Sequence, residues 1–127
     1  MTDSNSSHVF LNPDGYLEMT LIGRVETAKM RELTDQAIAL IQEHGPIGGL
    51  IDGRQGNIVR TVESLRILQR IQMPGLQRLV ILTAPDNPIA VRKPSIVMSM
   101  LTTMLGFRPI YLSDETEARA LVTRQPR

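Results

Sequence analysis

The sequence predicts a single α/β domain, in which a mostly parallel sheet of about five strands begins with a β-hairpin and packs against about four helices. Its 127 residues, of which 42% are hydrophobic, suit one domain with a substantial core. The turn sequence Asn-Pro-Asp-Gly at 12–15 separates two short apolar runs, which is typical of a hairpin. Beyond that turn, short β-branched runs alternate with stretches of helical periodicity, as in β-α-β units with parallel strands.

The first half of the chain reads as a hairpin, a helix and a buried strand. Runs 8–11 and 16–23 form the predicted hairpin, and one face of the second strand carries Leu17, Met19 and Leu21. Thr27 is placed to cap a helix over 28–45, whose periodic apolar residues are Met30, Leu33, Ala37, Leu40 and Ile41. Gly45 and Pro46 end that helix, and the apolar run 47–52 then predicts a strand buried on both faces.

The second half repeats the alternation of helix and strand. After a polar, glycine-bearing loop, a helix is expected over 61–73, with a buried stripe formed by Val62, Leu65, Leu68 and Ile71. The run 78–83 is the clearest central strand, since it is apolar and rich in β-branched residues. A helix over 94–105, a strand over 108–113 and a closing helix over 115–123, capped by Ser113 or Asp114, complete the order.

The expected domain spans 8–124, with a flexible polar tail at 1–7 and a short tail at 125–127. The amino-terminal residues lack the apolar run of a signal peptide. No apolar segment reaches the ~18 residues that a membrane helix needs. These features favour a cytoplasmic protein of bacterial type without integral membrane contact.

The composition argues against most catalytic chemistry. The absence of Cys excludes disulfides, thiol catalysis and cysteine metal sites. His8 and His44 lack metal-type spacing to a carboxylate, and no Gly-x-Ser-x-Gly motif positions a nucleophile. Asp52 follows a strand but has no evident acid or base partner. We therefore expect no catalytic residues, no metal and no cofactor.

Charge is distributed unevenly along the chain. Residues 1–51 carry a net charge of −4, whereas residues 52–93 carry +4. This basic middle either attracts an acidic partner or phosphate, or is simply a solvated helix face that bears arginines. Aromatic residues make up only 3% of the chain, which argues against binding of nucleic acid by base stacking.

Two stretches carry a family resemblance. "LIDGRQGNIVRTVESLRIL" (50–68) and "GFRPIYLSDETEARALV" (106–122), together with the order of elements, resemble the STAS domain. This is the fold of the bacterial anti-sigma factor antagonists, also described as SpoIIAA-like or STAS/SEC14-related, and the resemblance covers about residues 8–124. It implies a non-enzymatic regulatory domain that binds a protein partner of the kinase-like or sigma-regulatory class. The alternative that it implies is a SEC14-like domain that binds a lipid or a small apolar or anionic ligand.

The resemblance also suggests a phosphoacceptor. In STAS antagonists, the Asp of the third strand is followed by an Asp-Ser pair, and the partner kinase phosphorylates that Ser. With Asp52 on the first Asp, Arg60 stands in place of the second and Thr61 in place of the Ser. Thr61 is therefore the possible phosphoacceptor. The loss of the acidic neighbour, and Glu63 in place of a small glycine, argue against a conserved phospho-serine switch.

The junction of strand and helix is the predicted binding site, for a partner or an anion. Its candidate residues are Asp52, Arg54, Asn57, Arg60, Thr61 and Ser64. A helix N-terminus favours an anion, and arginines add charge-assisted donors. The same Thr61 also serves as an ordinary helix cap that needs no function.

The helix over 94–105 is apolar almost all round, with no charge from Ser95 to Phe107. Such a helix is buried on more than one side, by a neighbouring helix, a second subunit, a partner protein or a lipid. Its methionines suit an adaptable contact surface, although they also fill gaps in ordinary cores. We expect a homodimer, with an interface made by Met98, Met100, Leu101 and Met104.

Overall fold

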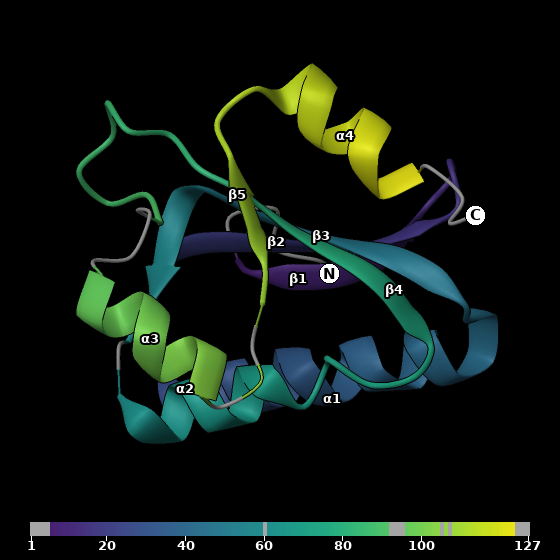
Figure 1. The fold of residues 1–127 in the computed structure, drawn as a ribbon, viewed down its shortest axis with the longest axis horizontal. Coiled ribbons are helices and arrows are strands. Elements are labelled where there is room, and N and C mark those ends of the chain that lie inside the picture. The colour runs from purple at the N-terminus through teal and green to yellow at the C-terminus, as the bar shows by residue number, and fades with distance from the viewer. Residues whose placement is uncertain (1–5, 60, 92–95, 105, 107, 124–127) are drawn as a thin grey trace.

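A five-stranded sheet organises the chain, as the computed structural model shows (Figure 1). The structure describes residues 6–59, 61–91, 96–104, 106 and 108–123, without the side chains of 97, 98, 101 and 102. The strands lie in chain order across the sheet: β1 (His8–Asn12), β2 (Tyr16–Val25), β3 (Ile47–Ile58), β4 (Leu76–Leu82) and β5 (Ile110–Leu112). β1 pairs antiparallel with β2, and every later pair is parallel. The predicted fold class is confirmed.

The described residues form four helices: α1 (Thr27–His44), α2 (Val62–Gln69), α3 (Ile96–Met104) and α4 (Glu115–Thr123). In Figure 1, α1 and α2 lie against one face of the sheet, and α4 lies against the other. Helix α3 lies at the end of the molecule toward which β3 points. The molecule therefore has three layers, with the sheet between α1 and α2 on one face and α4 on the other.

The opening hairpin forms for the reason that its turn sequence predicts. The Gly15 N–H donates to the Asn12 carbonyl at 2.8 Å, and the Asn12 Oδ1 accepts from the Asp14 N–H at 2.8 Å. Gly15 has a φ of +90°, a backbone conformation that favours glycine. In the antiparallel pairing of β1 with β2, Asn12 lies opposite Tyr16 at the turn and His8 lies opposite Thr20 at the other end.

Two hydrophobic clusters lie on the two faces of the sheet. The larger one joins β2, β3 and β4 to α1 and α2, and the α1 side chains Met30, Leu33, Ala37 and Ile41 are buried in it as predicted. The smaller one lies beneath α4 and consists of Tyr16, Leu50, Val80, Leu82, Ala118 and Val122. Because the central strands contact a layer on each face, their sequences are apolar at successive positions.

Strand β3 is longer than the sequence suggests. A strand was expected over 47–52 followed by a polar loop, but β3 continues to Ile58 and pairs with β2 as far as Val25. One register shift lies between Thr20 and Ile22 and accommodates the extra residue in β3. A Cβ on Gly56 would lie 2.7 Å from the Gly23 carbonyl oxygen. Glycine therefore lets the two strands approach closely, rather than forming a loop.

The buried face of α2 partly matches the predicted one. Leu68 and Ile71 are buried as predicted and Leu65 is half-buried, whereas the side chain of Val62 is exposed. Ser64 and Ile67 are buried in addition, and Ser64 Oγ lies 2.9 Å from Thr27 Oγ1 of α1. The prediction that Thr27 caps α1 is wrong. Thr27 is the first residue of the helix, and Glu26 occupies the cap position without a side-chain hydrogen bond. Helix α2 also ends at Gln69 rather than at residue 73.

Other predicted helix boundaries are confirmed. The N–H of Gly45 donates to the Ile41 carbonyl at 2.8 Å and closes α1. Thr61 caps α2, since its Oγ1 accepts from the Ser64 N–H at 3.0 Å. Asp114 caps α4 in the same way, by accepting from the Glu117 N–H at 2.9 Å.

Thr34 is an unsatisfied polar group in the core. It lies on the inner face of α1, fully buried, and its Oγ1 has no hydrogen-bond partner among the described residues. A buried hydroxyl without a partner destabilises the folded state, because it gives up hydrogen bonds to water and forms none in the protein.

We therefore predict that Thr34→Val raises the free energy of unfolding by about 1 kcal/mol, because it removes the hydroxyl and keeps the shape. Urea unfolding monitored by circular dichroism measures this change. Thr34→Ser is the matched control, since it keeps the hydroxyl and loses the methyl group, and it is expected to destabilise. A Val variant no more stable than the parent would contradict the prediction.

Candidate functional site

Asp52 and Arg54 form a bidentate ion pair on the α4 face of β3. The Arg54 Nε lies 3.0 Å from Asp52 Oδ1, and Nη2 lies 2.8 Å from Oδ2. Burial alone raises the pKa of Asp52, but the hydrogen bonds and charge of Arg54 outweigh burial and hold that pKa below its ordinary value. Asp52 is therefore ionised, with both oxygens occupied, and is not a free general base.

The ion pair continues into a network that attaches α4 to the sheet. Arg54 Nη1 lies 2.6 Å from Glu115 Oε1, and Glu115 Oε2 lies 2.8 Å from Arg119 Nε. Arg119 Nη1 then donates to the buried Glu18 Oε1 at 2.7 Å and to the Tyr16 hydroxyl at 2.6 Å. Burial raises the pKa of the Tyr16 phenol, so this hydroxyl stays neutral. These charges link β3, α4 and β2, and serve the packing of the domain.

Thr61 and Ser64 lie on the opposite side of the sheet, at the start of α2. Thr61 is exposed and caps the helix, whereas Ser64 is fully buried against Thr27. The first-turn carboxylate Glu63 pairs with Arg31 of α1 at 2.9 Å. Of Thr61 and Ser64, only Thr61 therefore has an accessible hydroxyl, whereas Ser64 supports the packing of α2 against α1.

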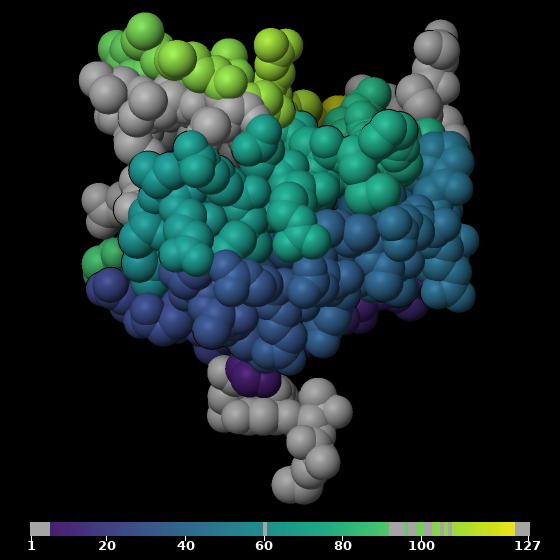
Figure 2. Space-filling view, turned by 90° about the horizontal axis from the view of Figure 1, so that it is seen from below, coloured from purple at the N-terminus to yellow at the C-terminus, as the bar shows by residue number. Residues whose placement is uncertain are grey.

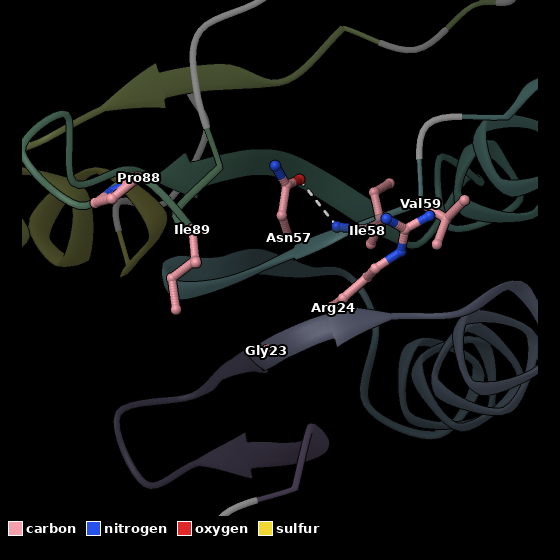
Figure 3. A pocket seen from close by; sticks show the side chains of 7 residues that line it. All are labelled: Gly23, Arg24, Asn57, Ile58, Val59, Pro88 and Ile89. Atoms are coloured by element: carbon pink, nitrogen blue, oxygen red, sulfur yellow. Dashed lines mark hydrogen bonds between the residues drawn. The ribbon is translucent and has the colours of Figure 1, made fainter.

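An open cleft of about 340 Å³ lies where β2 and β3 end (Figure 3). Its walls are mostly apolar, with Arg24 and Asn57 as the polar side chains; the lining residues are Gly23, Arg24, Asn57, Ile58, Val59, Pro88 and Ile89. The Asn57 Oδ1 accepts from the Ile58 N–H at 2.9 Å, and its Nδ2 has no partner among the described residues. The side chain of Ile89 is 55% exposed.

The Ile89 wall of the cleft is held in place by hydrogen bonds to the backbone of β3. Asn87 Nδ2 donates to the Arg54 carbonyl at 2.8 Å, and Asn87 Oδ1 accepts from the Ile89 N–H at 3.2 Å. The Val91 N–H donates to the Gly53 carbonyl at 2.8 Å. The segment that carries Ile89 is therefore fixed to the strand that carries Asn57.

The six predicted binding residues are distributed over three environments. Asp52 and Arg54 face α4, Asn57 lines the cleft, and Thr61 and Ser64 belong to α2, while Arg60 lies outside the described residues. The structure therefore brings only some of them together. Their assignment as a binding site stays a prediction.

Sequence reasoning missed two groups of residues. Pro88, Ile89 and Arg24 line the cleft, and the only sequence signal was an apolar residue in a proline-containing turn. Glu115 and Arg119 are spaced for a helical ion pair, which the sequence does show. The contact of Arg119 with Glu18 spans most of the chain and has no local signature.

Helix α3 exposes an apolar stripe. Ile96 is 81% exposed, Met100 62% and Met104 81%. The side chains of Met98 and Leu101, also expected at the interface, lie outside the described residues. Within the described part of the chain, no helix has the length and hydrophobicity to cross a bilayer.

Solved structures with the same fold confirm the architecture. A DUF3478-family protein with a SpoIIAA-like fold from Shewanella loihica PV-4 superimposes with a TM-score of 0.58 at 12% identity, covering 96% of this chain and 99% of that one. The anti-sigma factor antagonist SpoIIAA in its unphosphorylated form has a TM-score of 0.53 at 12% identity, with 91% and 94% covered. The Bacillus cell fate determinant SpoIIAA in its phosphorylated form has a TM-score of 0.50 at 10% identity, with 91% and 98% covered. No protein-family model and no curated protein matches the sequence.

These likenesses show that the chain has a SpoIIAA-like fold, as the STAS resemblance implied. At such low identity, they show the fold alone, and residue roles do not follow from them.

The ion-pair network predicts loss of stability in acid. Hydrogen bonds from Arg119 and Arg54 hold the pKa of Glu115 below its ordinary value, and Arg54 lowers that of Asp52. Because both folded-state pKa values lie below the unfolded ones, their stabilisation is present above the unfolded values and lost as the pH falls through the folded ones. The free energy of unfolding should therefore decrease as the pH is lowered below the ordinary values of 4.5 and 3.8.

Arg54→Met is expected to flatten this decrease, since it removes the cation that both carboxylates share. Urea unfolding between about pH 5 and pH 3 measures the slope. Arg66→Met, at an exposed arginine of α2, is the control and should keep the parent slope. Equal slopes in the parent and Arg54→Met would refute this role of the network.

The cap of α2 gives a second prediction. Thr61→Ala should lower the free energy of unfolding by about 1 kcal/mol, because the Ser64 N–H loses its acceptor. Thr61→Ser keeps the oxygen and should stay close to the parent in the same urea titration. If the two variants are equally stable, the cap contributes nothing measurable.

Proposed function

We propose that this chain is a non-enzymatic regulatory domain of the STAS, anti-sigma factor antagonist-like type, acting in the bacterial cytoplasm. Its partner is a regulatory protein of the kinase-like or sigma-regulatory class, bound at the cleft between β2, β3 and Ile89. The SpoIIAA-like fold supports the class of function. The apolar cleft with its exposed Ile89 supports the place of binding and is the observation that carries the proposal.

The state of the charged residues supports a non-catalytic role. Asp52 has a lowered pKa and both oxygens bound to Arg54, whereas a general base near neutral pH needs a raised pKa and access to substrate. Glu18 and Glu115 are likewise engaged with Arg119. In the described ranges, no cluster of three His, Asp or Glu side chains is arranged for a metal.

The composition of the cleft suits a protein partner. Apolar walls from Ile58, Val59 and Ile89 surround a centre that a partner side chain can fill, while Arg24 and Asn57 supply a polar rim. An apolar anchor in such a hollow typically carries a large share of the binding free energy. The hydrogen bonds that fix the Ile89 segment reduce the entropy lost on binding.

Two finer parts of the proposal concern Thr61 and self-association. We infer that the domain works without a phospho-serine switch, since the Thr61 hydroxyl already serves as a helix cap and its acidic neighbour is replaced by Arg60. Phosphate found on Thr61 after incubation with a kinase partner would contradict this inference. The predicted homodimer stays a prediction, because exposure in one subunit does not show what covers it.

The same cleft gives a second candidate function. Its volume of about 340 Å³ falls within the ~300–1,000 Å³ typical of small-ligand sites. Arg24 and Asn57 beside apolar walls suit a small amphipathic anion. Because the cleft is open to solvent on one side, it favours a protein partner over an enclosed ligand.

A photo-crosslinking residue placed at Ile89 in the source organism should yield a specific protein adduct, and one placed at the exposed Gln36 of α1 should not. The crosslinked protein, purified, should bind Ile89→Asp about tenfold or more weakly than the parent, which corresponds to ~1.4 kcal/mol. Gln36→Asp is the matched control and should bind normally.

Equal adducts at the two positions, or undiminished binding of Ile89→Asp, would overturn the docking site. Native mass spectrometry of the purified chain separates the two candidates. A retained small molecule that Ile89→Asp loses would establish the ligand function in place of the protein partner.

A further inference from the structure

The two edges of the sheet differ in how they are protected. Exposed edge strands are commonly short, charged, interrupted by proline or bulged, because a free edge pairs readily with another strand. β5 has only three residues and follows Arg108 and Pro109. β1, the opposite edge, has five residues with no Asp, Glu, Lys, Arg or Pro, and its pairing with β2 has no register shift. The β1 edge therefore lacks these protections.

The backbone groups on the outer side of β1 belong to Val9 and Leu11. The Asn12 carbonyl accepts from the Gly15 N–H inside the hairpin, so the backbone of Asn12 faces β2. Because backbone groups alternate in direction along a strand, Phe10 also faces β2, whereas Val9 and Leu11 face outward. On that side, the N–H and C=O groups of these two residues have no partner among the described residues.

This outer edge lies at the periphery of the molecule. In Figure 2, the purple start of the described chain appears at the margin of the molecule, beside α1. Outward N–H and C=O groups at strand spacing are complementary to another extended backbone, which supplies the same groups at the same spacing. The occupant that fits this edge is therefore a β-strand.

We propose that β1 pairs antiparallel with β1 of a second copy of the chain, around a two-fold axis at Phe10. The pairing joins the two five-stranded sheets into one continuous sheet. This inference goes beyond the proposed function, since the surface is neither the cleft nor the α3 stripe. It also gives the predicted homodimer a different interface from the one expected on the methionine-bearing helix.

The sequence of β1 is complementary to itself in this register. Val9 of each copy lies opposite Leu11 of the other, and both residues have outward backbone groups, so each such pair exchanges both of its hydrogen bonds. The two Phe10 rings meet at the axis, and His8 lies opposite Asn12. Apolar, aromatic and polar side chains are thus each paired with their own kind, which favours a second copy over an unrelated strand.

Charges along the paired strands do not oppose this register. Within residues 6–15, Asp14 is the one Asp, Glu, Lys or Arg, and it falls opposite Ser6 beyond the end of the strand. Glu18, on β2 opposite Phe10, is paired with Arg119. Like charges directly opposite each other would destabilise a strand pair, and this register places none opposite each other.

The test uses the absence of Cys from the chain, which makes an introduced thiol the only one. Phe10→Cys places two thiols across the axis, where the Cα atoms of such a pair are about 4.5 Å apart, within the ~4.4–6.8 Å that a disulfide spans. Thr20→Cys is the matched control, because Thr20 is half-buried like Phe10 and lies on the same face, one strand inside the edge. Under mild oxidation, Phe10→Cys should form a covalent dimer about tenfold faster or more than Thr20→Cys.

The unmodified chain provides a second readout, hydrogen exchange followed by NMR. The amides of Val9 and Leu11 should be protected in concentrated protein and lose that protection on dilution, whereas the Phe10 amide, which faces β2, should stay protected throughout. Circular dichroism checks that both Cys variants are folded. A parent that remains monomeric at about 1 mM, where even weak pairing is populated, overturns the proposal.

Equal crosslinking of the two Cys variants also overturns it, and so does a dimer in which the Val9 and Leu11 amides exchange freely. A dimer of that kind that Met100→Asp dissociates would assign self-association to α3 instead.

Discussion

The parallel pairing of β2 with β3 determines where the rest of the molecule lies. It continues past Asp52 to Val25 and Ile58, through a register shift and a close approach of Gly23 and Gly56. Because both strands extend this far, their ends form the floor of the cleft. The extension also delays α2 until Val62, so that the exposed Thr61 cap lies beyond the end of the sheet.

The two faces of the sheet are covered by different physical interactions. On one face, α1 and α2 bury a continuous aliphatic cluster, and the Thr27–Ser64 hydroxyl pair joins the two helices. On the other, α4 buries only Ala118 and Val122 fully, and Arg119 supplies much of its attachment through charged hydrogen bonds. The attachment of α4 therefore depends on ionised carboxylates, whereas aliphatic burial holds most of the opposite face.

This use of charge explains the character of the candidate site. Asp52 and Arg54 lie near the carboxyl end of the sheet, where α/β proteins commonly bind ligands. Asp52 is nevertheless paired with Arg54, and Arg54 also pairs with Glu115. The cleft at this end has mostly apolar walls, and Ile89 is exposed beside it. Such a cleft suits binding of a partner better than catalysis, and α3 adds a separate exposed apolar face.

The sequence alone determined the class of fold, the order of its strands and helices and most helix ends, because these depend on local patterns. Short-range patterns encode the alternation of strand-like runs with stretches of helical periodicity. They also encode the Asn12–Gly15 turn and the helix caps Thr61 and Asp114. Tertiary structure alone decided the length of β3, the burial of Ser64 and the contact of Arg119 with Glu18. Each depends on a partner distant in sequence, such as β2 for β3 or Thr27 for Ser64, and no local pattern encodes a contact of that kind.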